Sequence, residues 1–156
     1  MNIVRLVEAV VFVTKAKLIE LLNQALELEH QAEAQYLSHA TLLSGETADT
    51  ITERLTEIAG DEHKHAELFR SCLEMLDAVP SIKMHEGHPA TGTKNILKTN
   101  LKDEREAVDF YRTIIAEIQK SKAELPYEWE FIEHKVRHIL MDEEEHALEI
   151  RTLLGE

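Results

Sequence analysis

Two copies of one short polar pattern in this chain could bind metal ions. Each copy consists of a glutamate and, further along the chain, a Glu-x-x-His triplet. The first copy is Glu29, Glu62 and His65, and the second is Glu104, Glu143 and His146. Residues three apart on an α-helix project from one face, so the glutamate and histidine of a triplet can reach a shared ion. Carboxylate and imidazole together suit iron and manganese. The pattern therefore predicts a carboxylate-bridged site for two metal ions.

The hydrophobic periodicity indicates that these six residues face a core. A single Glu-x-x-His triplet carries little weight in a chain with 30 acidic residues and 9 histidines. Over residues 18–43, however, apolar residues recur at alternating steps of three and four, and Glu29 occupies one of these positions whereas Glu27 does not. The same spacing places the other five residues on core-facing stripes. All six are therefore predicted to point inward.

Burial of four glutamates requires compensating charge. Ionised carboxylates in a shared core would suffer desolvation and mutual repulsion worth many kcal/mol, or would be forced to take up protons. Two divalent cations would cancel their charge. The alternative is an ordinary helix bundle, with satisfied histidines in its core and glutamates in solvent. The presence of two complete ligand sets favours the metal site over this alternative.

Composition favours a single all-α domain. The chain has 156 residues, which is enough for one domain with a sizeable core. Glycine and proline are scarce, with 5 and 3 residues, and aromatic residues make up only 5%, so helices are favoured over strands. We expect residues 1–14 to form an N-terminal extension and residues 15–156 to form a helical bundle.

Capping signals and helix breakers predict four helices. Thr14 is expected to cap the first, and Pro126 to lie in the first turn of the fourth. Thr50 and Glu53 have the spacing of a capping box for the second. The expected helices cover residues 15–43, 50–77, 93–121 and 126–154.

The expected connections bring both copies of the polar pattern to one level. The first and second helices, and the third and fourth, are joined by short links, so each pair is predicted to form an antiparallel hairpin. The link over residues 78–92 is long enough to cross the length of the bundle. Within the first hairpin, Glu29 and Glu62 are equally far from the expected turn. Glu104 and Glu143 are related in the same way within the second. Each hairpin therefore delivers one ligand set to the middle of the bundle.

The sequence around these residues resembles that of bacterioferritins, which belong to the ferritin-like di-iron carboxylate superfamily. The similarity covers roughly residues 18–154 and is carried by Gln-Tyr-Leu-Ser-His-Ala at 35–40, Asp-Glu-His-Lys-His-Ala at 61–66 and Ile-Leu-Met-Asp-Glu-Glu-Glu-His at 139–146. It implies a ferritin-like four-helix bundle of two antiparallel hairpins joined by a long crossover. It also implies that Glu62 and Glu143 bridge the metals. The implied ferroxidase ligands are Glu29, Glu62, His65, Glu104, Glu143 and His146.

The resemblance implies a ferroxidase, which oxidises Fe(II) to Fe(III) at a buried di-iron centre with O2 or H2O2, for iron storage or detoxification. Tyr36 matches a tyrosine near the metals that supplies an electron. One alternative is a di-iron or di-manganese oxidase or peroxidase whose metals stay in place and which stores no mineral. Another is a non-catalytic bundle that serves as an interaction module. The residues alone leave all three open.

Three departures from bacterioferritins bear on cofactors and assembly. Where bacterioferritins have a methionine that ligates a shared haem, this chain has His63, which leaves haem ligation open because histidine also binds haem iron. The chain ends at Glu156, before the short fifth helix of 24-subunit cages. Residues 1–14 could occupy an interface in its place. We expect a homo-oligomer, a dimer or larger, with a differently closed cage among the possibilities.

Charge and cysteine content limit the partners and the location. The net charge of −13 would repel nucleic acid and attract cations. A single cysteine, Cys72, excludes an internal disulfide, and the chain shows neither a membrane-spanning apolar run nor a persuasive signal peptide. We therefore expect a cytoplasmic protein that does not bind membranes.

Three other polar or aromatic residues have less specific positions. Tyr111 follows Glu104 by seven residues, as Tyr36 follows Glu29, and core packing is the favoured interpretation over a second redox tyrosine. His85 and His88 fall in the expected crossover, where they could capture metal, although loop histidines usually have no such role.

Overall fold

The structure, a computed structural model, describes the backbone of residues 3–156 and the side chains of residues 15–156. Over this range the chain forms four long α-helices and one short 3-10 helix. In chain order they are α1 (Ile3–Ala40), α2 (Ala48–Met75), α3 (Thr93–Ser121), η1 (Lys122–Glu124) and α4 (Trp129–Leu154). No helix within this range is long and apolar enough to cross a bilayer. The all-α prediction is confirmed.

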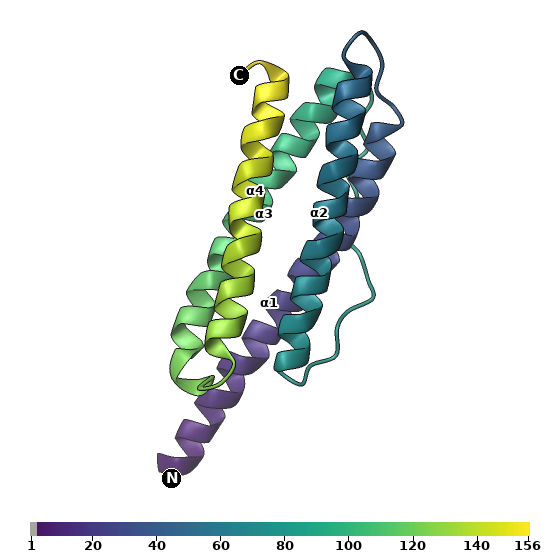
Figure 1. The fold of residues 1–156 in the computed structure, drawn as a ribbon. Helices are drawn as coiled ribbons and strands as arrows, with labels where there is room; N and C mark the ends of the chain where they lie inside the picture. Colours follow the sequence, from purple (N-terminus) through teal and green to yellow (C-terminus); the bar gives the residue numbers. More distant parts are fainter. Residues whose placement is uncertain (1–2) are drawn as a thin grey trace.

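The helices form the expected bundle of two antiparallel hairpins (Figure 1). The α1–α2 hairpin packs beside the α3–α4 hairpin, and the chain between α2 and α3 runs back along the outside of the bundle. Side chains of α1 hold this crossover in place. The Asn23 amide accepts a hydrogen bond from the Ser81 backbone N–H at 2.7 Å, and His30 Nδ1 donates to the Lys83 carbonyl oxygen at 2.7 Å. The crossover therefore follows a defined path over α1.

Five of the expected helix bounds are wrong, although α3 has the expected bounds. Three helices begin elsewhere, and α1 and α2 end at Ala40 and Met75 rather than at residues 43 and 77. The first helix begins at Ile3 and passes through Thr14, because the preceding residues contain no glycine or proline and a threonine inside a helix costs only a few tenths of a kcal/mol. Its N-terminal end projects beyond the α3–α4 turn (Figure 1). The interface role expected for residues 1–14 concerns side chains that lie outside the described residues.

The starts of α2 and α4 also differ from expectation. The helix α2 begins at Ala48, so Thr50 lies inside it and forms no capping box; Thr47 precedes the helix without a side-chain cap. The helix α4 begins at Trp129, because the chain after η1 first makes a turn that contains Pro126. The Trp129 indole N–H donates to the Ile118 carbonyl oxygen at 3.1 Å, which ties the start of α4 to the end of α3.

Two apolar clusters fill the bundle on either side of a polar layer. One cluster includes Leu22, Phe69 and Ile132, and the other includes Leu55, Leu97 and Ile150. These side chains come from all four long helices and are almost fully buried. The clusters fix the helices above and below the layer, and they keep bulk water from its ends.

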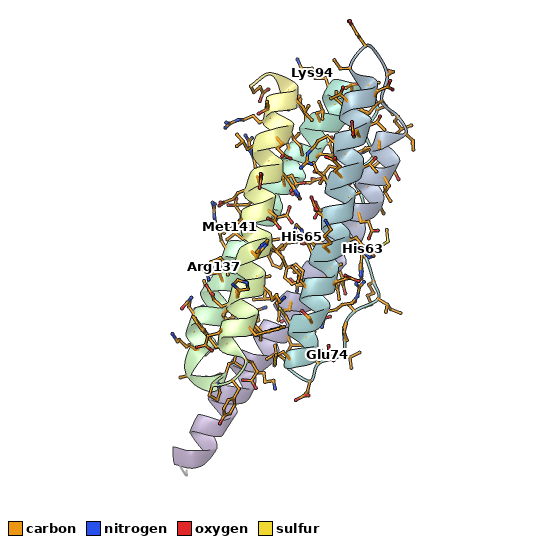
Figure 2. The ribbon with its side chains drawn as sticks, viewed as in Figure 1. His63, His65, Glu74, Lys94, Arg137 and Met141 are labelled. Atoms are coloured by element: carbon orange, nitrogen blue, oxygen red, sulfur yellow. The ribbon has the colours of Figure 1, made fainter. Side chains whose placement is uncertain are left out.

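Replacement of Phe69 by alanine tests the contribution of this packing. Phe69 is fully buried, so Phe69→Ala is expected to lower the free energy of unfolding of the metal-free protein by about 3–5 kcal/mol. Urea denaturation followed by circular dichroism measures the change. The control is Met141→Ala on the outside of α4 (Figure 2), which is 62% exposed and should alter stability by no more than about 0.5 kcal/mol. Equal losses in the two variants would contradict this account of the core.

Candidate metal centre

The six residues of the repeated polar pattern meet in the layer between the apolar clusters. Each is between 1% and 4% exposed, so the inward orientation predicted from the periodicity is confirmed. Figure 2 shows His65 pointing from α2 into the space between the helices. Every long helix contributes to the layer. Its members are Glu29 from α1, Glu62 and His65 from α2, Glu104 from α3, and Glu143 and His146 from α4.

The six side chains form two adjacent groups that share two glutamates. In each group, one ligand atom from every residue lies within 4.8 Å of the others. Both groups contain Glu62 and Glu143. The first group is Glu29, Glu62, His65 and Glu143, and the second is Glu62, Glu104, Glu143 and His146. A pair of ions placed in the two groups would therefore be bridged by Glu62 and Glu143.

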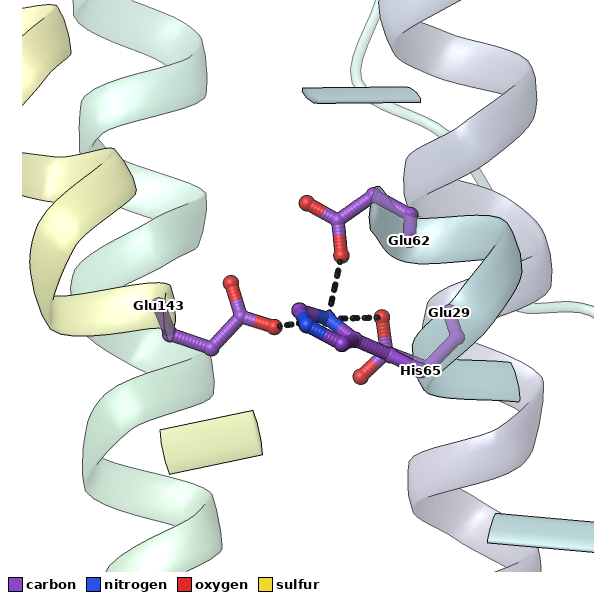
Figure 3. Close-up of side chains that lie close together, drawn as sticks. All are labelled: Glu29, Glu62, His65 and Glu143. Carbon is purple, nitrogen blue, oxygen red and sulfur yellow. Dashed lines mark hydrogen bonds and ion pairs between the residues drawn. The ribbon is translucent and has the colours of Figure 1, made fainter. Parts of the chain in front are cut away.

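One nitrogen of His65 faces the carboxylates of the first group (Figure 3). Its Nδ1 lies 2.9 Å from Glu143 Oε1, 3.1 Å from Glu62 Oε2 and 3.8 Å from Glu29 Oε2. These three carboxylates come from three different helices. The imidazole therefore presents Nδ1 as its potential metal ligand.

The second group repeats this arrangement around His146. Its Nδ1 lies 3.3 Å from Glu62 Oε1, 3.4 Å from Glu143 Oε2 and 3.9 Å from Glu104 Oε2. The ring centroids of the two histidines are 5.8 Å apart. The site therefore has an internal two-fold symmetry that matches the repeat in the sequence.

Two aspartates orient the histidines from behind. His65 Nε2 lies 3.2 Å from Asp142 Oδ2, and His146 Nε2 lies 3.6 Å from Asp61 Oδ2. The hydrogen bond from His65 holds the pKa of Asp142 below its usual range. A carboxylate on the outer nitrogen directs the other nitrogen at a metal and makes it a stronger ligand. Neither aspartate is in the expected ligand set. The sequence signal that could have identified them is that each directly precedes one of the two shared glutamates, Glu62 and Glu143.

Two tyrosines donate hydrogen bonds to Glu29 and Glu104, the two glutamates that each belong to only one group. The Tyr36 hydroxyl of α1 donates to Glu104 of α3, and the Tyr111 hydroxyl of α3 donates to Glu29 of α1. Burial, followed by repulsion from the nearby carboxylates, raises the pKa of both phenols, so they remain donors. Tyr111 also packs edge-on against Phe69, as core packing predicts, with ring centroids 5.4 Å apart. The hydrogen bond from its hydroxyl to Glu29 gives Tyr111 a second role besides core packing.

In the metal-free protein, bound protons offset negative charge on the carboxylates of the layer. Burial, with repulsion from Glu143 and Glu62, raises the pKa of Glu29 and of Glu104 well above the usual value. Burial opposes the charged form of His146, but hydrogen bonds with Glu143 and Glu62 outweigh it and raise its pKa to about 10. The same competition raises the pKa of His65, which contacts four carboxylates. The cluster therefore holds protons that cations can replace.

The donor atoms of the layer fit two divalent cations. Among the described residues, three buried atoms of the layer have ion-pair contacts but no well-oriented hydrogen bond, namely Glu62 Oε1, Glu143 Oε1 and His146 Nδ1. An unpaired buried carboxylate oxygen is costly, and a metal ion would satisfy it. Four carboxylates and two imidazole nitrogens are a ligand set suited to iron or manganese.

The exposed histidine expected as a possible haem ligand lies away from this layer. His63 points from the opposite side of α2 (Figure 2), and its Nδ1 is 3.3 Å from the Glu33 carboxylate. Its Nε2 is 3.9 Å from Glu67. Both ring nitrogens face carboxylates, and haem ligation by His63 stays a prediction.

A cavity of about 250 Å³ reaches the layer from between α1 and α3. Its inner end is formed by the carboxylates and by Tyr36 and Tyr111. Part of its wall is apolar, and its outer part is polar. The apolar part comprises Leu28, Ala32, Ala107 and Phe110, and the polar part includes Gln35, His88, Asn100 and Asp103. Small molecules and ions therefore have space beside the site.

A bundle of two antiparallel hairpins with one Glu from each of two helices and Glu-x-x-His from each of the others is the arrangement of ferritin-like di-metal carboxylate proteins. Comparison with known protein families agrees. Residues 19–156 match the ferritin family, described as a ferritin-like domain, and the chain therefore belongs to it. The resemblance noted in the sequence is thereby confirmed.

Solved structures show the same fold. A ferritin-like, diiron-carboxylate protein from Bacillus anthracis str. Ames has 23% sequence identity to this chain and a TM-score of 0.80. The match covers 90% of this chain and 97% of the Bacillus anthracis chain. The dodecameric thioferritin of Bacteroides fragilis, a bacterioferritin-related protein, has 24% sequence identity and a TM-score of 0.77. The match covers 90% of this chain and 86% of the thioferritin chain. Comparison with curated proteins gave no match.

Loading the centre with metal is expected to release protons. The groups with raised pKa values hold their protons to higher pH than usual in the metal-free protein, and cations must displace those protons, so affinity should fall as pH decreases. Titration calorimetry with Mn(II), at one pH in two buffers with different protonation enthalpies, measures the number released. Equal heats in the two buffers would show that the cluster holds no exchangeable protons.

The reciprocal tyrosines should act on different halves of the centre. Tyr111→Phe removes the donor to Glu29 and should weaken the first group about 10-fold, whereas Tyr36→Phe should weaken the second group to a similar extent. Co(II) titration followed by visible absorption separates the two binding steps. Tyr127→Phe, at a position 88% exposed, serves as the control. If both buried variants titrate like the wild type, the hydroxyls do not support the ligands.

Proposed function

We propose that this protein is a ferroxidase that oxidises Fe(II) to Fe(III) at the buried centre, for iron storage or detoxification. The observation that carries the proposal is the pair of adjacent ligand groups that share Glu62 and Glu143. Family membership supports the di-iron character of the site. The acidic net charge of −13 favours attraction of Fe(II) as the substrate.

Two iron ions held side by side suit the chemistry of dioxygen and peroxide. Each Fe(II) supplies one electron, so a filled centre can supply two to a single oxidant. Two electrons and two protons reduce O2 to H2O2, or reduce H2O2 to two molecules of water. The buried carboxylates stabilise the higher charge of Fe(III). The protons displaced during loading are available nearby.

Tyr36 is proposed as an electron donor to the centre. Its hydroxyl donates to Glu104 of the second group, so the phenol would lie beside an iron held there without being a ligand itself. Transfer of an electron from the phenol requires loss of its proton, and the Glu104 carboxylate accepts the hydrogen bond along which that proton would move. Tyr111 has the equivalent contact with Glu29.

Storage would require several copies of the chain to enclose a space. The thioferritin of Bacteroides fragilis is a dodecamer, and we propose that this chain also forms a homo-oligomer. Large apolar side chains exposed along the crossover and on α1 support this. Val79 is 85% exposed and Ile82 is 98% exposed, and apolar surface of this kind commonly lies at subunit contacts. The cytoplasmic location expected from the sequence stays a prediction.

A di-iron or di-manganese oxidase or peroxidase with fixed metals is the second candidate. The apolar wall of the cavity favours it, because Leu28, Ala32 and Phe110 offer contacts to an organic substrate beside the carboxylates. Ala107 adds to this space, because its small side chain leaves room beside the site.

Aerobic titration of the metal-free protein with Fe(II) separates the two functions. A ferroxidase that stores iron should oxidise far more than two Fe(II) per chain and keep the product soluble. A fixed-metal enzyme should stop at two per chain. Oxidation is followed by absorbance, and iron that remains with the protein is counted after gel filtration.

The double substitution Glu62→Ala with Glu143→Ala should abolish both binding and oxidation, because both groups lose their shared ligands. The matched control is Glu67→Ala with Glu144→Ala, which removes two carboxylates from the same helices at positions 66% and 50% exposed. Retention of two bound ions by the first variant would contradict the proposed centre.

A further inference from the structure

The outer end of the cavity between α1 and α3 has a second pair of metal-ligating side chains. His88 of the crossover and Asp103 of α3 line this end, and their side chains are 52% and 21% exposed. His88 Nδ1 lies 3.0 Å from both carboxylate oxygens of Asp103. The cavity thus runs from a partly exposed imidazole and carboxylate to the buried carboxylates of the centre.

The local hydrogen bonds fix the position of this pair. The backbone N–H of His88 donates to Gln35 Oε1 at 2.7 Å, which defines the orientation of the Gln35 amide. Gln35 Nε2 therefore donates to Asp103 Oδ2 at 2.7 Å. Asp103 Oδ1 is left with His88 as its partner. The crossover is held so that an imidazole nitrogen and a carboxylate oxygen stand together at the mouth of the cavity.

The inner end of the same cavity contains atoms that require a cation. Glu62 and Glu143 line it, each is at most 2% exposed, and Oε1 of each has no hydrogen-bond partner. This end of the passage therefore presents carboxylate oxygens to which a cation can bind in place of protons. A divalent cation that reached the mouth would be drawn inward by these carboxylates.

We propose that His88 and Asp103 form an access site that first binds the divalent metal on its way to the buried centre. The inference rests on the proposed function, because it assigns a route to that site. A nitrogen and a carboxylate oxygen suit Fe(II). From there the ion moves along the cavity to the buried carboxylates.

The other polar cavity at the centre fits this role less well. It lies between α2 and α4, has a volume of about 300 Å³ and is lined by Arg54, Asp61, Glu145 and His146, among others. The Arg54 guanidinium places a positive charge in the path of a cation. Asp61 is already engaged by Lys64 at 2.8 Å. The α1–α3 cavity has no arginine or lysine in its lining.

The test is the rate at which Co(II) loads the metal-free protein, followed by stopped-flow absorption. Asp103→Asn keeps the shape of the side chain but removes its charge. We expect loading at subsaturating Co(II) to slow roughly 10-fold, with two Co(II) per chain still bound at equilibrium. His88→Gln should slow loading in the same way. Asp109→Asn, on the same helix at a position 78% exposed, removes an equal charge away from the cavity and should load like the wild type.

Three results would overturn the access site. In the first, Asp103→Asn and His88→Gln both load at the wild-type rate. In the second, only Glu145→Gln slows loading, which assigns the route to the α2–α4 cavity. A reduced equilibrium stoichiometry in Asp103→Asn would also contradict it, because the residue would then belong to the centre itself. Failure of the wild-type protein to bind two Co(II) would instead refute the proposed function.

Discussion

The burial of four carboxylates and two imidazoles in one layer is the constraint on which the rest of this structure depends. Charged groups in a bundle core are costly unless ions or protons compensate them. Each long helix contributes at least one of the six side chains, so the layer forms only when both hairpins are in register. The apolar clusters above and below supply the packing that holds this register. The buried ligands therefore lower the stability of the same few helical turns that metal binding requires, and the apolar clusters offset this cost.

The two hairpins support each other's ligands. Tyr36 and Tyr111 exchange hydrogen bonds between α1 and α3, and Asp61 and Asp142 face the histidines of α4 and α2. Neither hairpin contains both a histidine and the aspartate that orients it. This reciprocity explains why the sequence repeats its polar pattern: each half presents ligands and also holds those of the other half. A change in the angle between the hairpins would disturb both metal groups at once.

Periodicity was sufficient to predict the layer, but contacts between helices were not predictable in the same way. The inward orientation of Glu29 and Glu104 followed from their place in the apolar stripes, and the hairpin topology followed from the link lengths. Thr14 and Thr50 were poor guides to helix ends, because a threonine is tolerated inside a helix when no breaker precedes it. The positions of Tyr111 and His88 depend on packing across the bundle and on the path of the crossover, which local sequence does not specify.

We propose that these six residues hold two metal ions and that the ions share Glu62 and Glu143. Anomalous diffraction from crystals of the protein grown with Mn(II), measured on both sides of the manganese absorption edge, tests it most directly. The account predicts two anomalous peaks in the polar layer, about 3.5–4 Å apart, one within each ligand group. A layer without anomalous signal, in crystals that bind Mn(II) elsewhere, would contradict the account.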